Sequence, residues 1–364
     1  MPTDAVPHSE SAQPPYCPTL QQLSPQAARL CLNVRRFSTE RLHLQKNVHL
    51  LLALSGGADS TALAVILHIL APGLGLTLRA MTLNHGLRPE ATQEQEYVLA
   101  LCRNLNIPCS CHTADVAELA QREGMGLEEA GRSLRYALLE EERKAHNAAY
   151  IVLGHHAEDL SEDVLLRLIR GTGWPGLGGM QARDEKRHLL RPLLAVRPQQ
   201  LKALLTECNI TWCTDASNAD RSFRRNRLRL DVLPQLRAEN PSLERSVQNL
   251  WQLARLDESY WETLLNTALS NYPWQITDGG LLLPAELLET LHPAARLRLY
   301  IRALRMLESI SAKQTANQGQ ARATTLLALE QALQQRRGNT RFLLPGGTEV
   351  RLKRGAILFC RCPA

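Results

Sequence analysis

Short apolar runs alternate with longer amphipathic stretches between residues 48 and 195, and this alternation constrains the fold more than any other feature of the sequence. The apolar runs, each of strand length, lie at 48–54, 76–83, 108–113, 149–153 and 188–194. The stretches with helical spacing lie at 59–70, 90–105, 127–146 and 155–170. This pattern predicts an α/β fold with a doubly wound, mostly parallel sheet covered by helices on both faces. Ligands of such sheets bind beyond the carboxyl ends of the strands, so the segments after the strands are the candidate sites.

Helical spacing predominates after residue 195. Helices are expected at 198–208, 240–270 and 285–335, and a hairpin is expected from strands at 341–344 and 348–359. Pro273 and the pair Gly279-Gly280 mark a boundary. We therefore expect a tail at 1–28, a catalytic domain at 29–240, a linking helix at 241–270 and a smaller C-terminal α/β or α+β domain at 271–364.

The N-terminal segment and the cysteines indicate a cytoplasmic protein. Residues 1–28 contain six prolines, two acids and no Lys or Arg, which predicts a disordered tail and not a signal peptide. The chain has nine cysteines and no CxxC pair, a pattern typical of reduced thiols. No segment approaches the roughly 20 apolar residues that span a bilayer.

Basic residues gather in two places. Residues 296–364 carry 13 Lys and Arg against three acids, a balance of +10, so the rest of this +6 chain sums to −4. A second cluster is opposed only by Asp231 and consists of Arg221, Arg224, Arg225, Arg227, Arg229 and Arg237. Arginines bind phosphates without any sequence pattern, so both places suggest a polyanionic partner. A solvated basic face is the alternative.

The stretch LLALSGGADSTALAVILHIL, residues 51–70, places a glycine-rich turn between a strand and a helix. Glycines let backbone N–H groups approach an anion, and the start of a helix adds positive charge. The turn lacks the lysine of a Walker A loop, so the backbone and a metal must balance the negative charge of a bound anion. Asp59 is then the natural Mg²⁺ ligand. An ordinary strand–helix turn with a capping side chain is the alternative.

The sequence SGGADS at 55–60 matches the SGGxDS signature of the PP-loop, or N-type ATP pyrophosphatase, family. Further stretches, in the same order, resemble tRNA(Ile)-lysidine synthetases within that family. These stretches are LNHGLR at 83–88, GLEEAGRSLRY at 126–136, GHHAED at 154–159 with Glu162 and LLRL at 165–168, RGTG at 170–173, GL at 176–177, RPL at 191–193, and Asp215, Ser217, Asn218, Arg225, Asn226 and Arg229. The resemblance spans roughly residues 45–255.

The resemblance implies an adenine nucleotide alpha hydrolase-like fold and a ligase that uses ATP and Mg²⁺. Such enzymes adenylate the wobble cytidine in the CAU anticodon of a minor isoleucine tRNA. The ε-amine of free L-lysine then displaces AMP, so that lysidine, AMP and pyrophosphate are the products. The implied partners are this tRNA and lysine, without a membrane, and a homodimer is left open.

The resemblance also implies roles for individual residues. The implied catalytic residues are Asp59, which is also the metal ligand, Asp159 and Glu162. The implied ATP contacts are Ser55, Gly56, Gly57, Asp59, Ser60, Asn84, His85, Arg88 and Arg225. The implied lysine contacts are Glu128, Arg132, Arg135 and Glu162. The arginine cluster adds the expected tRNA contacts Arg221, Arg224, Arg227 and Arg229, and the C-terminal domain at 271–364 is also expected to bind the tRNA. Solvated surface charges are the alternative for the helical acids, for the lysine-contacting arginines and for the cluster.

Some residues depart from the family pattern. Glu158 stands where an Asp is usual, Asp163 where a Thr is usual, and Leu160 where a Gln is common. A second C-terminal domain, which many relatives carry, is not expected.

Three other functions compete with this interpretation. They are a tRNA sulfur-transferase with a PP-loop, a non-catalytic RNA-binding relative, and a PP-loop amidotransferase or ligase for a small metabolite. The lack of CxxC disfavours the first of these.

Overall fold

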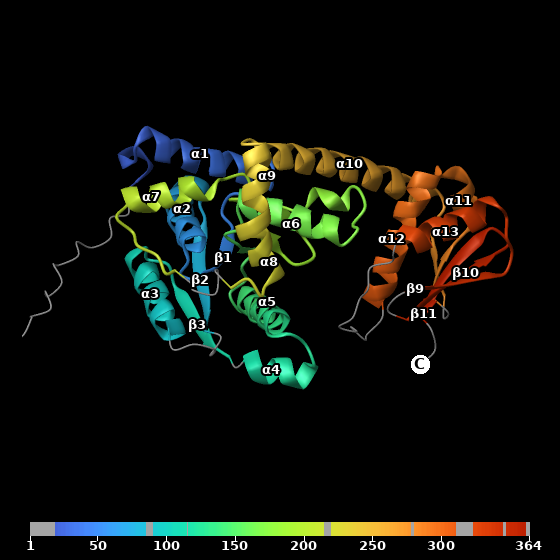
Figure 1. Cartoon of the computed structure of the whole chain (residues 1–364), viewed down its shortest axis with the longest axis horizontal. Coiled ribbons are helices and arrows are strands. Elements are labelled where there is room, and N and C mark those ends of the chain that lie inside the picture. The colour runs from blue at the N-terminus through green and yellow to red at the C-terminus, as the bar shows by residue number, and fades with distance from the viewer. Residues whose placement is uncertain are drawn as a thin grey trace, which may run out of the picture. The chain divides into compact units, whose positions relative to one another are not determined.

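The computed structural model of the chain describes residues 19–84, 90–114, 116–214, 220–277, 280–310, 323–344 and 347–361 (Figure 1). It divides into two compact units. The first unit comprises Met1–Arg170 and Gly179–Leu250, and the second comprises Gly171–Gly178 and Trp251–Ala364. The division falls inside the long helix α10, Leu243–Asn271.

The first unit is built on a six-stranded sheet in the order β3-β2-β1-β4-β6-β5. Its strands are β1 (His49–Ala53), β2 (Thr77–Asn84), β3 (Cys109–Thr113), β4 (Tyr150–Val152), β5 (Arg183–Asp184) and β6 (Leu189–Leu190). All neighbouring pairs are parallel except β5 with β6. Leu50, Leu51 and Leu52 of the inner strand β1 are all buried, as expected of a strand covered on both faces. The expected mostly parallel sheet is confirmed.

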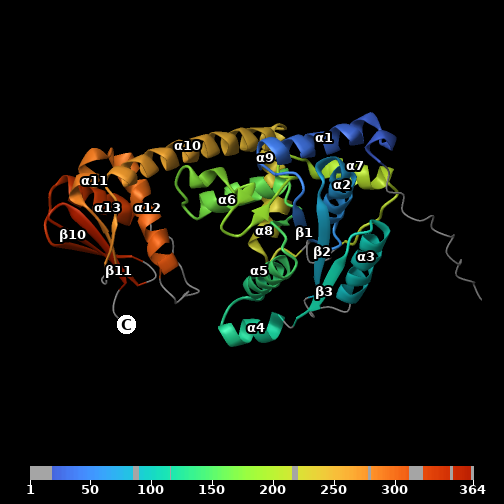
Figure 2. The ribbon, with the colours of Figure 1, turned by 180° about the vertical axis from the view of Figure 1, so that it is seen from behind.

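Helices cover the two faces of this sheet (Figures 1 and 2). The helices of the first unit are α1 (Pro25–Glu40), α2 (Ala58–Leu74), α3 (Glu90–Asn104), α4 (Val116–Glu123), α5 (Leu127–Ala145), α6 (Ala157–Ile169), α7 (Pro198–Glu207), α8 (Arg224–Arg227) and α9 (Leu233–Glu239). The apolar residues of α2 are buried nearly all round because this helix contacts α1 and α7 as well as β2. Leu139 of α5 packs with Leu51, Met81 and Ile151 of three strands.

The expected N-terminal tail is too long, because the chain is already helical before residue 28. A single 3₁₀ turn covers Leu20–Gln22, and α1 begins at Pro25. Ser24 caps α1 by accepting a hydrogen bond from the N–H of Ala27 at 3.3 Å. The pair Ser24-Pro25 is a typical helix start, since Ser is a favoured N-cap and Pro needs no N–H at the first helical position. Residues 1–18 lie outside the described part of the chain.

The second unit contains an antiparallel sheet in the order β7-β8-β11-β10-β9. Its strands are β7 (Gln275–Thr277), β8 (Gly280–Leu283), β9 (Thr340–Leu344), β10 (Thr348–Lys353) and β11 (Ala356–Arg361). The expected strand over 348–359 is therefore two strands, because the chain turns at Arg354 and Gly355, which both have positive φ. The helices of this unit are α11 (Ala285–Thr290), α12 (Pro293–Ile310) and α13 (Ala323–Gln334), so the unit is α+β.

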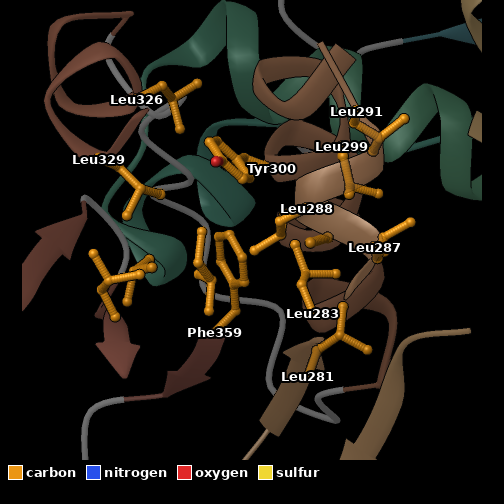
Figure 3. Packing of buried hydrophobic residues seen from close by; sticks show 14 of the residues in the cluster. Leu281, Leu283, Leu287, Leu288, Leu291, Leu299, Tyr300, Leu326, Leu329 and Phe359 are labelled. Carbon is orange, nitrogen blue, oxygen red and sulfur yellow. The ribbon is translucent and has the colours of Figure 1, made fainter. Parts of the chain in front are cut away.

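The core of the second unit lies between one face of this sheet and its helices (Figure 3). Phe359 of β11 is fully buried and lies 6.2 Å from the ring of Tyr300 on α12, measured between ring centroids. Gly280 lets β8 pair closely with β11, because a Cβ at this position would lie 2.0 Å from the carbonyl oxygen of Phe359. Its φ of +135° also favours glycine.

We expect Phe359→Ala to lower the free energy of unfolding of the second unit by about 3–5 kcal/mol, because truncation leaves a cavity in a close-packed core. Leu343→Ala is the control, since Leu343 is 74% exposed on the same sheet. Scanning calorimetry, with hydrogen exchange of the β10 and β11 amides, measures both. Equal effects of the two substitutions would contradict the assignment of this core.

Candidate active site

The glycine-rich turn joins β1 to α2 and is held by its own hydroxyl groups. Ser60 Oγ accepts a hydrogen bond from the N–H of Ser55 at 3.2 Å and donates to the carbonyl of Gly57 at 3.1 Å. Thr61 Oγ donates to the carbonyl of Gly56 at 3.3 Å. Gly56 has a φ of +81°, which favours glycine. The two hydroxyls therefore shape the turn, and Ser55 is the exposed serine on it.

The start of α2 is free to bind an anion. Gly57 occupies the N-cap position and provides no side-chain cap to the first turn. The N–H groups of a first helical turn lack partners within the helix, and the helix dipole places positive charge there. Gly154, after β4, lies against this turn, because a Cβ there would be 3.1 Å from the backbone nitrogen of Ser60. The geometry of this turn, called the phosphate cradle below, is suited to holding phosphate oxygens.

Asp59 lies on the same turn and faces His156. The side chain of Asp59 is 40% exposed, and its Oδ2 lies 3.4 Å from Nε2 of His156. The same Nε2 lies 3.4 Å from Oδ2 of Asp159. His156 Nδ1 accepts the N–H of Glu158 at 3.2 Å, so the proton of the neutral ring sits on Nε2, toward the acids. Burial lowers the pKa of His156, but the hydrogen bond to Asp59 and the charge of Asp159 outweigh this effect and raise it.

Two buried acids and two half-buried arginines form a network next to His156. Arg225 Nη2 contacts Asp159 Oδ1 at 2.7 Å, and Arg225 Nε contacts Glu162 Oε2 at 2.5 Å. Arg229 Nε contacts Glu162 Oε1 at 2.5 Å, and Arg229 Nη2 contacts Asp159 Oδ1 at 3.3 Å. Glu162 is 0% exposed and Asp159 is 7% exposed. Buried carboxylates need such partners, because charge out of water is costly unless it is paired.

The network lowers the pKa of Asp159. Burial alone raises the pKa of this carboxyl, but the charges of His156 and Arg225 and the backbone N–H of His156, which donates to Oδ2 at 2.9 Å, outweigh burial. The structure thus brings Asp159 and Glu162 together, as their spacing on one helix predicted. It also gives Arg225 and Arg229 carboxylate partners. The ATP contact expected of Arg225 and the tRNA contact expected of Arg229 stay predictions.

A π-turn over Leu228–Val232 places Arg229 in this network. The N–H of Leu233 reaches back five residues to the carbonyl of Leu228. Pro234 follows and has no N–H to continue a regular helix. Such turns are frequent at functional sites, and the sequence analysis did not find this one. Pro234, inside a stretch with helical spacing, was the sequence signal that could have indicated this turn.

Half-buried His155 and buried Arg191 form a second pair beside the network. Arg191 Nε donates to His155 Nδ1 at 3.2 Å, and Arg191 Nη1 donates to the carbonyl of Gln181 at 2.5 Å. Burial lowers the pKa of His155 to about 4, and the charges of Arg191, Arg225 and Arg132 act in the same direction. His155 is therefore neutral at pH 7. The sequence analysis gave no role to either histidine or to Arg191, although the pair of histidines after a strand was a signal.

The other expected site residues are partly placed. Asn84 ends β2 and donates to Gln95 at 3.3 Å. Arg132 and Arg135 lie three apart on α5, and the Arg132 guanidinium lies 5.5 Å from the Tyr136 ring centroid. Residues outside the described part of the chain, or with undescribed side chains, are His85, Arg88, Glu128, Asp215, Ser217 and Asn218.

Arg221, Arg224 and Arg227 of the basic cluster are exposed, and Arg237 is half-buried. Arg221 pairs with Asp231 at 3.1 Å. Arg227 Nη1 donates to the carbonyls of Arg221 and Ser222, at 2.7 and 2.6 Å. The guanidinium of Arg227 is thus held in place near the surface, where a phosphate can reach it. Arg224 precedes it on α8 and is also exposed.

The acids that depart from the family pattern have partners of their own. Glu158 pairs with Arg237 at 3.0 Å, and Arg237 also pairs with Glu244 at 2.6 Å. Asp163 pairs with Arg167 one turn later on α6, at 2.8 Å. Both acids therefore stabilise helix contacts and stay outside the buried network.

Lowering the pH should test the network. Folding that lowers the pKa of a carboxyl stabilises the protein above the unfolded pKa, about 3.9 for Asp, and this contribution disappears as the pH falls through the folded pKa. We therefore expect Asp159→Asn to lose stability at pH 6 and to show a weaker pH dependence below pH 4 than the wild-type protein. Asp231→Asn, which removes an exposed acid, is the control. Parallel pH curves for wild type and Asp159→Asn in urea unfolding would contradict this assignment.

Known proteins resemble the chain over both units. The family described as the PP-loop domain matches residues 29–236. A tRNA(Ile)-lysidine synthase of Nitratidesulfovibrio vulgaris is 44% identical over 333 residues, which cover 87% of this chain and 93% of that protein. A tRNA(Ile)-lysidine synthase of Geobacter sulfurreducens is 35% identical over 286 residues, which cover 78% of this chain and 60% of that protein. One of Thermosipho africanus is 34% identical, and the match covers half of its length.

A solved structure shares the fold. The U34-tRNA thiolase NcsA of Methanococcus maripaludis, with its [4Fe-4S] cluster, aligns with a TM-score of 0.54 at 16% identity over 63% of this chain and 80% of that chain. Among the described helices, none has the length and apolar character needed to cross a membrane. The family match and the identity to named synthases together show that the chain belongs to the tRNA(Ile)-lysidine synthase family of PP-loop proteins.

Proposed function

We propose that this protein ligates free L-lysine to the wobble cytidine in the CAU anticodon of a minor isoleucine tRNA, with ATP consumed to AMP and pyrophosphate through an adenylated cytidine. The observation that carries the proposal is the 44% identity to a named synthase over nearly the full length of both chains. The uncapped start of α2 beside Asp59 supports it, because the first step needs a triphosphate held at one end.

The triphosphate of ATP binds at the start of α2. In this proposal the backbone N–H groups after Gly57 and the Ser55 hydroxyl donate hydrogen bonds to the phosphate oxygens. Donors placed in this way stabilise the negative charge that develops on the leaving phosphates. Within the described chain, no group of three or more His, Cys, Asp or Glu side chains is arranged to hold a metal ion. This fits Mg²⁺, which is typically held by one or two carboxylates together with phosphate oxygens, and Asp59 is the carboxylate in place. When bound, Mg²⁺ neutralises charge on the triphosphate.

The network of Asp159, Glu162, Arg225 and Arg229 binds lysine in this proposal. The lowered pKa of Asp159 makes this carboxylate a better partner for an ammonium than a base for its proton. Asp159 and Glu162 are both held by Arg225 and Arg229, so the lysine ammonium replaces a guanidinium donor when it binds. The ammonium gives one proton to solvent, and the free amine attacks the adenylated base, so that the bond from carbon to nitrogen forms while the bond from carbon to the AMP oxygen breaks and AMP leaves with the electron pair. Glu128, Arg132 and Arg135 complete the lysine site in this proposal.

The tRNA is held through its phosphates. Arg221, Arg224 and Arg227 are exposed on one short segment of the first unit, and the second unit supplies the basic excess of residues 296–364. Phosphate contacts fix the position of a nucleic acid without reading its sequence. The target cytidine leaves its stack to reach the site, as bases do in other base-modifying enzymes.

Incubation with ATP, Mg²⁺, labelled lysine and an isoleucine tRNA with a CAU anticodon should transfer label to the tRNA. We expect Asp59→Ala to lower the rate by about 100-fold or more, because charge stabilisation at the triphosphate is lost. Asp231→Ala, which removes an exposed acid, should retain the rate.

No label in the tRNA with folded wild-type protein would overturn the proposal, as would full activity of Asp59→Ala. Incorporation of sulfur in a parallel assay would instead select the thiolating alternative. That alternative is disfavoured, since the sequence lacks a CxxC pair and the named relatives with high identity are lysidine synthases.

A further inference from the structure

Two thiols meet where α3 ends and β3 begins. Cys102 lies in the last turn of α3 and is 1% exposed, while Cys109 is the first residue of β3 and is half-buried. Their side chains are hydrogen-bonded to each other. Figures 1 and 2 show α3 beside β3 in both views. These two residues are called the thiol pair below.

The backbone holds the thiol pair in this position. The N–H of Ile107 donates to the carbonyl of Cys102 at 2.9 Å, which folds the connecting segment back onto the end of α3. On the other side, Cys109 pairs in register with Ala80 of β2, and the N–H of Ala80 donates to the carbonyl of Pro108 at 2.8 Å. Both sulfurs are therefore carried by regular secondary structure, and their proximity follows from the fold itself.

The thiol pair lines a cavity of 310 Å³ that opens to solvent. Its other lining residues include the apolar side chains of Leu99 and Ile107 and the cationic side chain of Arg103. A water molecule occupies about 30 Å³ in the liquid, so a molecule as small as hydrogen peroxide has room to reach the sulfur of Cys109 through this cavity.

The two thiols differ in reactivity. The hydrogen bond from Cys102 and the charge of Arg79 lower the pKa of Cys109, against the opposing effects of burial and of Glu142. The hydrogen bond to Cys109 and burial raise the pKa of Cys102. Because the thiolate is the nucleophilic form of cysteine, Cys109 is the thiol that reacts first with an oxidant, and Cys102 is placed to react with the oxidised sulfur.

The helix that carries Cys102 also touches the phosphate cradle. Val98 lies one turn before Cys102 on the same side of α3 and is fully buried. Its Cγ2 lies 3.4 Å from the position of a Cβ built on Gly56, and Cδ1 of Tyr97 lies 3.5 Å from that position. Closely packed side chains transmit displacements, so a shift of α3 reaches the glycine-rich turn.

We propose that the thiol pair is oxidised reversibly to a disulfide by a hydroperoxide, and that this disulfide slows the enzyme by displacing α3 against the phosphate cradle. The effect on lysidine formation rests on the proposed function, whereas the formation of the disulfide does not.

The oxidation takes two steps. First, the Cys109 thiolate attacks one oxygen of the hydroperoxide, so that a sulfur–oxygen bond forms, the oxygen–oxygen bond breaks and the other oxygen leaves with the electron pair. Next, Cys102 loses its proton and its sulfur attacks the Cys109 sulfur, so that the disulfide forms and hydroxide leaves and is protonated. With hydrogen peroxide, the two thiols lose two electrons and two protons, and the peroxide is reduced to two waters. Dithiothreitol reverses the oxidation by thiol–disulfide exchange.

Cys111 and Cys213 are also half-buried and are the rival sites of oxidation. The Sγ of Cys213 lies 3.4 Å from the Cβ position on Gly56, but burial and the charge of Glu94 raise the pKa of this thiol. Cys111 lies two residues after Cys109 on the same side of β3, and burial and the charge of Cys109 raise its pKa. Both rivals therefore hold less thiolate than Cys109 and react more slowly.

Mapping of the disulfide tests the thiol pair directly. The full chain is treated with equimolar hydrogen peroxide, its free thiols are alkylated, and it is digested with trypsin, which cuts after Arg103 between the two cysteines. We expect a disulfide between the peptides of Cys102 and Cys109 that disappears after dithiothreitol. In Cys102→Ser, oxidation of Cys109 should stop at the sulfenic acid, which dimedone traps. Absence of this disulfide in folded wild type, or a bridge from Cys109 to Cys111 in its place, would overturn the proposal.

Activity after oxidation tests the effect on the phosphate cradle. We expect peroxide to lower the rate of lysidine formation by wild type about fivefold or more, the usual size of coupling between two sites, and dithiothreitol to restore it. Cys109→Ser should keep its rate in peroxide. Cys111→Ser is the matched control on the same strand and should lose activity as wild type does. An equal loss in Cys109→Ser, as expected if Cys213 were the target, contradicts the proposal, as does full activity of the bridged wild type.

Failure of the proposed function gives a different result. If the reduced wild-type protein forms no lysidine, peptide mapping still reports on the disulfide, and hydrogen exchange of the amides of residues 56–61 still reports on the phosphate cradle. We expect oxidation to speed this exchange in wild type and to leave it unchanged in Cys109→Ser. Unchanged exchange in bridged wild type would overturn the displacement of the cradle.

Discussion

A buried network of two acids and two arginines joins segments far apart in the sequence, and the active end of the first unit depends on it. Asp159 and Glu162 start α6, while Arg225 and Arg229 lie 63 to 70 residues later. Removing one partner would leave a charge buried without compensation, which costs about 3–5 kcal/mol in comparable networks. Asp159 also contacts His156, which faces Asp59 on the turn before α2, so the network connects the acids that we propose to bind lysine with the proposed ATP site.

In the proposed function, this connection lets two reaction steps share one site. The start of α2 offers N–H groups to phosphate, and Gly154 allows the end of β4 to lie against that start. Both acids lie on α6, the helix that follows β4, so in the proposed function a cation bound by them lies beside the nucleotide. The parallel sheet makes this possible, because β1 and β4 are neighbours and their carboxyl ends open at the same edge.

Local sequence patterns predicted the sheet, the turn and the spacing of Asp159 and Glu162, because each depends on residues close together in the chain. The sequence could not predict which carboxylates Arg225 and Arg229 contact. The sequence showed Arg225 and Arg229 as part of a basic cluster, and their carboxylate partners depend on a π-turn before Pro234 and on long-range packing. The break between β10 and β11 at Arg354 was missed because a positive φ at arginine carries no local signal of its own, although Gly355 beside it was a turn signal.

The central claim is that ATP bound at the start of α2 activates the tRNA before lysine takes part. Quenched-flow measurement of pyrophosphate release, with tRNA present and lysine omitted, tests this claim most directly. The account predicts release that requires tRNA, amounts to about one equivalent per enzyme, and leaves the base adenylated until lysine is added. Release that requires lysine, or that proceeds at the same rate without tRNA, would contradict it.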